Sequence, residues 1–285
     1  MRSRPRMHAA RVSSIALSGT RPRSGAPPGR TVSVPSISRS PARTPAPRAA
    51  MSTSARAVPS VEFHAADAVI WDVDGTLADS TELGFTSTNA VLTEANLPAI
   101  TLAQYMVGTR YATPQRLAWH ATGDVDHPSG VELGAAFDRH YIALVSPRTA
   151  GFFPGAADLV AALAAVPNKS QAVLSNACGE YARAVMAAND VAKHMTLVHG
   201  ADDAPRVKPA PDGLLAQCAA MGFEPARCVY VGDSPSDGAA ARAAGMRSVG
   251  CLWGAHDRLA CEGNFDALVE TVDELAALLL GPGVR

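Results

Sequence analysis

Short apolar runs alternate with longer amphipathic segments from about residue 67 to residue 280. Unbroken apolar runs are typical of strands buried on both faces, whereas apolar residues every three or four positions indicate helices. The strand-like runs end near Asp72, Ser175, His199, Asp233 and Cys251. Helical spacing is clearest in Ala156 to Ala165, Gly179 to Ala188, Pro211 to Met221, Pro235 to Ala244 and Val272 to Leu280. This alternation predicts an α/β fold with a parallel sheet covered by helices on both faces.

The segment from Thr81 to Thr149 differs, because it has helical apolar spacing and no convincing strand. Asp79 through Glu82 resembles a capping box that would start its first helix. Gly155, directly after Phe152-Phe153-Pro154, marks the return to the main domain. We therefore predict a core domain of residues 61–80 and 150–285, large enough to bury a sizeable core, with a helical cap domain inserted at 81–149.

Candidate catalytic residues follow the apolar stretch Ala68 to Trp71, in the run Asp72-Val73-Asp74-Gly75-Thr76. Residues i and i+2 of an extended chain point to the same side, so both carboxylates face one site. Clustered carboxylates repel unless a proton or a cation lies between them, and oxygen ligands suit Mg²⁺. Gly75 allows a sharp turn, and Thr76 offers a hydroxyl and an amide to an anion. The alternative is an Asp-rich turn that has no catalytic or metal-binding role.

Three further motifs follow in order. Ser175-Asn176 comes after the apolar run Ala172 to Leu174, Lys208 lies in Val207-Lys208-Pro209, and Gly232-Asp233-Ser234-Pro235-Ser236-Asp237 ends the next strand-like run. With the DxDGT run, they resemble the four motifs of the haloacid dehalogenase superfamily of aspartyl-nucleophile phosphatases. The resemblance implies a Rossmann-like doubly wound parallel sheet with an inserted α-helical cap, and Mg²⁺ as cofactor.

The resemblance also implies roles for individual residues. Asp72 would be the nucleophile, and Asp74 would protonate the leaving group and then take a proton from water. The Mg²⁺ ligands would be Asp72, the Asp74 backbone carbonyl and Asp233, with Asp237 binding directly or supporting the others. The phosphoryl oxygens would be held by Thr76, Ser175, Asn176 and Lys208.

Several branches of the superfamily are distinguished by single residues. Asp74 argues against carbon–halogen cleavage, which does not use this second carboxylate. The absence of a cap lysine argues against phosphonoacetaldehyde hydrolysis, since the three lysines are Lys169, Lys193 and Lys208. Val107-Gly108-Thr109-Arg110 resembles a loop that holds the second phosphate in phosphosugar mutases. Arg110 could instead hold a substrate carboxylate, or simply be exposed.

Gly200 through Asp212 resembles the corresponding loop of phosphoglycolate phosphatase-like enzymes. We therefore expect a phosphatase acting on a small phosphorylated metabolite. The alternatives are a phosphosugar mutase and a non-catalytic binding module of the same fold, although a pure scaffold would be expected to lose its clustered acids. Five cysteines without CxxC spacing argue against zinc and against a disulfide framework.

Residues 1–60 form a basic leader with eleven Arg and no Asp, Glu or Lys. The other 14 of the 25 basic residues stand against 26 acids, so the remainder of the chain is acidic. The leader's apolar residues are too scattered for a core or a membrane span. Its composition predicts a disordered organellar transit peptide read by the import machinery, with a plastid favoured over a mitochondrion. An ordinary disordered extension is the alternative, and the lack of aromatics argues against nucleic-acid binding.

Overall fold

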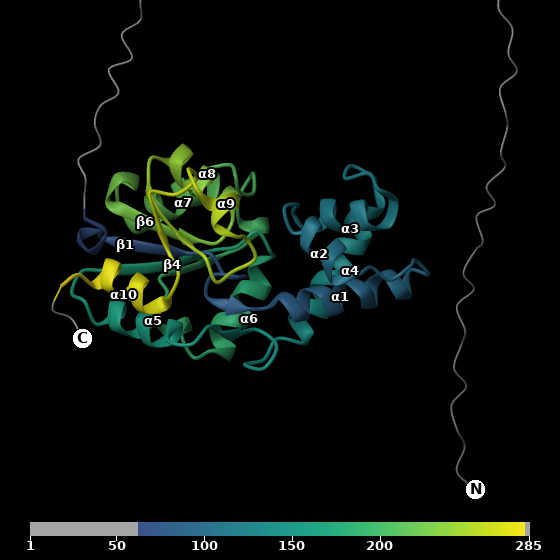
Figure 1. The fold of residues 1–285 in the computed structure, drawn as a ribbon, viewed down its shortest axis with the longest axis horizontal. Helices are drawn as coiled ribbons and strands as arrows, with labels where there is room; N and C mark the ends of the chain where they lie inside the picture. The colour runs from purple at the N-terminus through teal and green to yellow at the C-terminus, as the bar shows by residue number, and fades with distance from the viewer. Residues whose placement is uncertain (1–61, 283–285) are drawn as a thin grey trace, which may run out of the picture. The chain divides into compact units, whose positions relative to one another are not determined.

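The computed structural model describes residues 62–282, and its main element is a six-stranded parallel sheet with helices on both faces (Figure 1). The strand order is β5-β4-β1-β6-β7-β8, and β1 pairs in parallel with both β4 and β6. The strands are β1 Ala68–Trp71, β4 Ser170–Leu174, β5 Leu197–His199, β6 Cys228–Gly232, β7 Arg247–Cys251 and β8 Ala267–Val269. The predicted α/β fold with a parallel sheet is confirmed.

Alternate side chains of the central strand enter two different cores. Val69 and Trp71 pack into a cluster with residues of α5, α6 and α10, whereas Ala68 and Ile70 pack into a second cluster with residues of α7 and α8. All four β1 side chains are fully buried, which explains their unbroken apolar run. Figure 1 shows these two helix groups on opposite faces of the sheet. The core helices are α5 Ala156–Ala164, α6 Gly179–Ala188, α7 Asp212–Met221, α8 Pro235–Ala244, α9 Arg258–Cys261 and α10 Val272–Leu280.

The five helices predicted from apolar spacing are present, each with bounds within one residue of those expected. The edge strand β8, the four-residue helix α9, and the short antiparallel pair β2 Ala78–Asp79 and β3 Gly151–Phe152 were not predicted. Each is too short to show a period. Gly155 precedes α5 with φ +83°, a backbone conformation that favours glycine.

Four helices follow β2, namely α1 Thr81–Glu94, α2 Leu102–Gly108, α3 Thr113–Thr122 and α4 Ser129–Ala143. Val91, Leu117 and Phe137, from three of them, are buried in one cluster. The predicted capping box at Asp79 through Glu82 is wrong, because Ser80 precedes α1 without a side-chain capping bond. The Ser80 hydroxyl donates to Asp74 instead. The capping box in this region lies at Thr101 and Gln104 of α2.

The predicted transit peptide lies outside the described residues, and its role stays a prediction. Within residues 62–282, none of the helices combines the length and the apolar character needed to cross a bilayer.

Leu163 on α5 tests the packing of one sheet face, because its side chain is fully buried. We expect Leu163→Ala to lower the free energy of unfolding by about 2–5 kcal/mol through lost burial and a residual cavity. Leu259→Ala is the matched control, because Leu259 is 82% exposed and should change stability by less than about 0.5 kcal/mol. Urea denaturation measures both variants, and equal losses would contradict this packing.

Candidate active site

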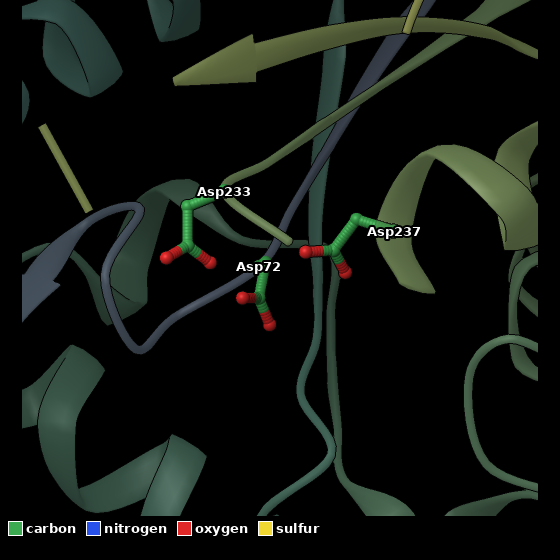
Figure 2. Close-up of side chains that lie close together, drawn as sticks. All are labelled: Asp72, Asp233 and Asp237. Carbon is green, nitrogen blue, oxygen red and sulfur yellow. The ribbon is translucent and has the colours of Figure 1, made fainter. Parts of the chain in front are cut away.

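Three buried carboxylates meet at the carboxyl ends of β1 and β6. Asp72 follows β1, Asp233 follows β6, and Asp237 lies in the first turn of α8. One oxygen from each lies within 4.8 Å of one from each of the others, and Figure 2 shows the three carboxylates turned toward one another. The side chains reach this point because neighbouring parallel strands end at the same edge of the sheet.

The loop after β1 permits the close approach of Asp233. Gly75 has φ +80°, and a Cβ atom there would lie 2.3 Å from an Asp233 carboxylate oxygen. A side chain at position 75 would therefore be strained by its backbone conformation and would displace an acidic group.

Lys208 lies among these acids and is itself buried. Its Nζ is 2.7 Å from Asp72 Oδ1 and 2.8 Å from Asp237 Oδ1, and it donates to the Tyr230 hydroxyl at 2.7 Å. Burial disfavours the ammonium, but Asp237 and Asp72 raise the pKa of Lys208 above its ordinary value. Lys208 therefore remains a cation in the interior of the protein.

One lysine does not balance three carboxylates. Burial raises the pKa of Asp72 to about 7, although Lys208 opposes this shift, and burial and Asp237 raise the pKa of Asp233 well above its ordinary value. Burial also acts to raise the pKa of Asp237, but the charge of Lys208 and the hydrogen bonds from Lys208 and Ser234 outweigh burial, so the pKa of Asp237 is lowered. With all three acids ionised beside one lysine, two excess negative charges would remain, and a divalent cation would neutralise them in place of protons.

The donor set fits Mg²⁺, because it consists of closely spaced carboxylate oxygens. Asp237 is already engaged on both oxygens: Lys208 and Tyr230 contact Oδ1, while the backbone amide and hydroxyl of Ser234 donate to Oδ2. Asp72 and Asp233 are less committed, with Lys208 and the Ala255 amide as their respective hydrogen-bond donors. This difference favours Asp72 and Asp233 as direct ligands and Asp237 as a support for Lys208.

Asp74 points to a different set of partners. Its Oδ1 accepts hydrogen bonds from Ser80 at 2.5 Å, Tyr141 at 2.9 Å and Tyr181 at 2.6 Å. Tyr141 lies on α4, Tyr181 lies on α6, and their rings stack with centroids 3.9 Å apart. Burial raises the pKa of both tyrosines well above the ordinary value, so both remain protonated donors near neutral pH.

A cavity of about 130 Å³ brings most of the predicted site residues together. Its wall includes Asp72, Asp74, Ser175, Asn176, Lys208 and Asp233 from the core, and Tyr105, Tyr111, Arg116, Phe137 and Tyr141 from the inserted segment. The volume is well below the about 300–1,000 Å³ of pockets for drug-sized ligands. The site therefore suits a compact molecule.

Three predicted residues do not lie in this wall. Asp237 lies behind Lys208, as described above. Thr76 is buried in the loop after β1, and its hydroxyl has no hydrogen-bond partner within residues 62–282. Arg110 is exposed in the turn after α2, where its guanidinium covers the Tyr111 ring, and it is not among the residues that line the cavity.

Two of the predicted phosphate ligands also make local contacts. The Ser175 hydroxyl accepts from the Ala177 amide at 3.0 Å. The Asn176 side chain donates to the Lys208 carbonyl at 3.1 Å and accepts from the Lys208 amide at 3.0 Å. Both polar ends of this side chain therefore hold Lys208 in place. The backbone amide of Asn176 is then the group that this residue can offer to an anion.

Sequence reasoning missed Tyr105, Arg116, Tyr141 and Tyr181. Each occurs in a helical segment with ordinary amphipathic spacing, and nothing in the local pattern marks it as part of a site. Asp74 gave an indirect signal, because a carboxylate at the end of a buried strand needs hydrogen-bond donors.

Comparison with known proteins identifies the family. Residues 69–251 match the model of the haloacid dehalogenase-like hydrolases, and the chain belongs to this family. Phosphoglycolate phosphatase of Xanthomonas campestris pv. campestris (strain 8004) is 33% identical over 187 residues, covering 66% of this chain and 83% of that protein. The enzyme of the same name from Escherichia coli (strain K12) is 30% identical over 213 residues, covering 68% and 84%. The chain is accordingly a phosphoric monoester hydrolase, as predicted.

Solved structures support the fold. The crystal structure of a putative phosphoglycolate phosphatase from Lactobacillus delbrueckii subsp. bulgaricus superposes with a TM-score of 0.65 at 21% identity, covering 78% of this chain and 100% of that chain. The fold of this chain is thus similar to that of a solved structure.

His120 on α3 tests the electrostatics around Arg116, which lines the cavity. Burial and the nearby Arg116 lower its pKa from 6.5 to about 4. The unfolded chain therefore binds more protons between these values, and the stability that His120 contributes above pH 6.5 is lost as the pH falls toward 4. We expect the difference in free energy of unfolding between the native protein and His120→Gln to shrink from pH 7.5 to pH 5. Urea denaturation at both values measures it, and a constant or growing difference would contradict the shift.

Proposed function

We propose that the protein is a Mg²⁺-dependent phosphatase that hydrolyses 2-phosphoglycolate through an aspartyl-phosphate intermediate. The observation that carries the proposal is the buried Asp72 carboxylate in the wall of a small cavity, with one oxygen held by Lys208 and two further acids beside it. The substrate is inferred from relatives named phosphoglycolate phosphatase and from the size of the cavity.

The first half of the reaction uses Asp72 and Asp74. An Asp72 oxygen attacks phosphorus, the new bond to Asp72 forms, and the bond between phosphorus and the ester oxygen breaks. The departing oxygen receives a proton from Asp74, and glycolate leaves. When bound, Mg²⁺ would neutralise negative charge on the phosphoryl group and on Asp72.

The second half regenerates the enzyme. Water attacks the phosphorus of the aspartyl phosphate and gives a proton to Asp74, while the bond to Asp72 breaks and inorganic phosphate leaves. Lys208 remains beside Asp72 throughout and offsets the charge that spreads over the phosphoryl oxygens. Ser175 and Asn176 lie in the same wall, where the Ser175 hydroxyl and the Asn176 backbone amide would orient those oxygens.

The phosphosugar mutase alternative loses its main support. It depended on Arg110 as a ligand for a second phosphate, and Arg110 lies outside the cavity wall. No other observation in the described part of the chain favours phosphoryl return over hydrolysis.

Asp72→Asn tests the nucleophile. We expect kcat for 2-phosphoglycolate to fall by at least about 10⁴-fold, the scale seen when a nucleophile is removed. Chelation of Mg²⁺ should also abolish phosphate release by the native protein. Asp190→Asn is the matched control, because the Asp190 side chain is 90% exposed and its loss should leave kcat unchanged. Activity retained by Asp72→Asn in a folded protein would refute the mechanism.

Tyr141→Phe and Tyr181→Phe test the positioning of Asp74. Each variant removes one hydroxyl donor and keeps the stacked ring. We expect about a 10-fold loss of kcat for an alkyl phosphate, since a hydrogen bond to a charged group contributes about 1.5–3 kcal/mol when intact.

The loss should be smaller for 4-nitrophenyl phosphate, whose leaving group departs without a proton. Equal losses for the two esters would show that the tyrosines act on something other than proton transfer.

A further inference from the structure

Arg116 is a buried cation that forms no ion pair within residues 62–282. It lies on α3, is 9% exposed, and lines the same cavity as Asp72 and Lys208. Its Nε atom has no hydrogen-bond partner within residues 62–282, and none of the ion pairs found there includes it. A buried charge is costly unless it is paired, so this position is complete only when an anion reaches it.

Neighbouring residues hold the guanidinium without neutralising it. Its central carbon lies 4.5 Å from the centroid of the Phe137 ring and 5.4 Å from that of the Tyr105 ring. These aromatic faces stabilise a cation and fix its plane, but they carry no net charge. The Tyr105 hydroxyl is a neutral polar neighbour, since burial raises its pKa.

Ionisable neighbours do not supply the missing anion. Asp138 on α4 feels the field of Arg116, which opposes the rise that burial causes in its pKa, but no ion pair joins the two residues. Asp138 also lies outside the cavity wall. Asp74 is in the wall, but three hydroxyl groups already occupy its Oδ1.

The geometry points to a carboxylate on the substrate. A planar guanidinium matches a carboxylate or phosphate with two parallel hydrogen bonds. The phosphoryl end of the substrate belongs beside Asp72 and Lys208, and the cavity of about 130 Å³ leaves room for few further atoms. We infer, on the basis of the proposed function, that Arg116 binds the carboxylate of a short phosphorylated hydroxy acid and selects this class over neutral phosphoesters.

A carboxylate fits better than a second phosphate. Arg116 is the one Arg or Lys among the cavity-lining residues contributed by helices α1–α4. A single positive charge balances a carboxylate, whereas a phosphate group carries up to two negative charges near neutral pH.

The test compares two esters that share a two-carbon skeleton, 2-phosphoglycolate and ethyl phosphate, using the full chain with Mg²⁺. We expect Arg116→Gln to lower kcat/KM for 2-phosphoglycolate by about 30-fold, mainly through KM, and for ethyl phosphate by less than about 3-fold. Arg116→Lys should give an intermediate loss, because it keeps the charge but not the two-pronged geometry.

Arg110→Gln is the matched control from the same part of the chain. Arg110 is exposed and lies outside the cavity wall, so its loss should change neither ester by more than about 2-fold. An equal loss on both esters in Arg116→Gln would assign Arg116 a packing role and overturn the inference.

Two further outcomes are decisive without any variant. If the native protein hydrolyses both esters with the same kcat/KM, the inference fails even if Arg116→Gln does not fold. A higher kcat/KM for ethylene glycol bisphosphate than for 2-phosphoglycolate would overturn the choice of a carboxylate. If the native protein hydrolyses no phosphoester, the proposed function itself fails, a result distinguishable from the other two.

Discussion

Lys208 Nζ lies between two buried carboxylates, 2.7 Å from Asp72 and 2.8 Å from Asp237, and the site depends on this contact. Without the ammonium, three acids would share a nearly dry space and repel one another. Asn176, which follows β4, holds the Lys208 backbone, and Tyr230 on β6 accepts from its side chain, so two neighbouring strands help to secure one cation. The remaining negative charge is what makes the site suitable for a divalent ion.

The sheet explains why these groups meet. Strands β1, β4 and β6 are neighbours, and Asp72, Ser175 and Asp233 directly follow their ends. Most strand side chains face two apolar cores, and the buried Gln171 of β4 is satisfied locally by Trp71 and the Val160 carbonyl. The acids instead follow the strand ends, where neighbouring parallel strands share one edge.

The core and its acids could be predicted because each signal is local. An apolar run that ends in Asp72-Val73-Asp74 predicts both a buried strand and acidic side chains at its carboxyl end.

The inserted part of the site could not be predicted in this way, because the direction of a side chain there depends on how four helices pack. Arg110 follows a glycine turn and attracts notice in the sequence, yet it is exposed. Arg116 has ordinary helical surroundings, and only the packing of α3 against α4 turns it toward the cavity. The short strands β2, β3 and β8 were missed because two or three residues carry no period.

The stacked rings of Tyr141 and Tyr181 join the inserted helix α4 to the core helix α6, and both hydroxyls donate to the same oxygen of Asp74. A displacement of α4 by one hydrogen-bond length would separate Tyr141 from that oxygen, while Tyr181 would stay. The carboxylate would thereby lose one of its three donors, so the orientation of Asp74 depends on the packing of an inserted helix as well as on the core sheet.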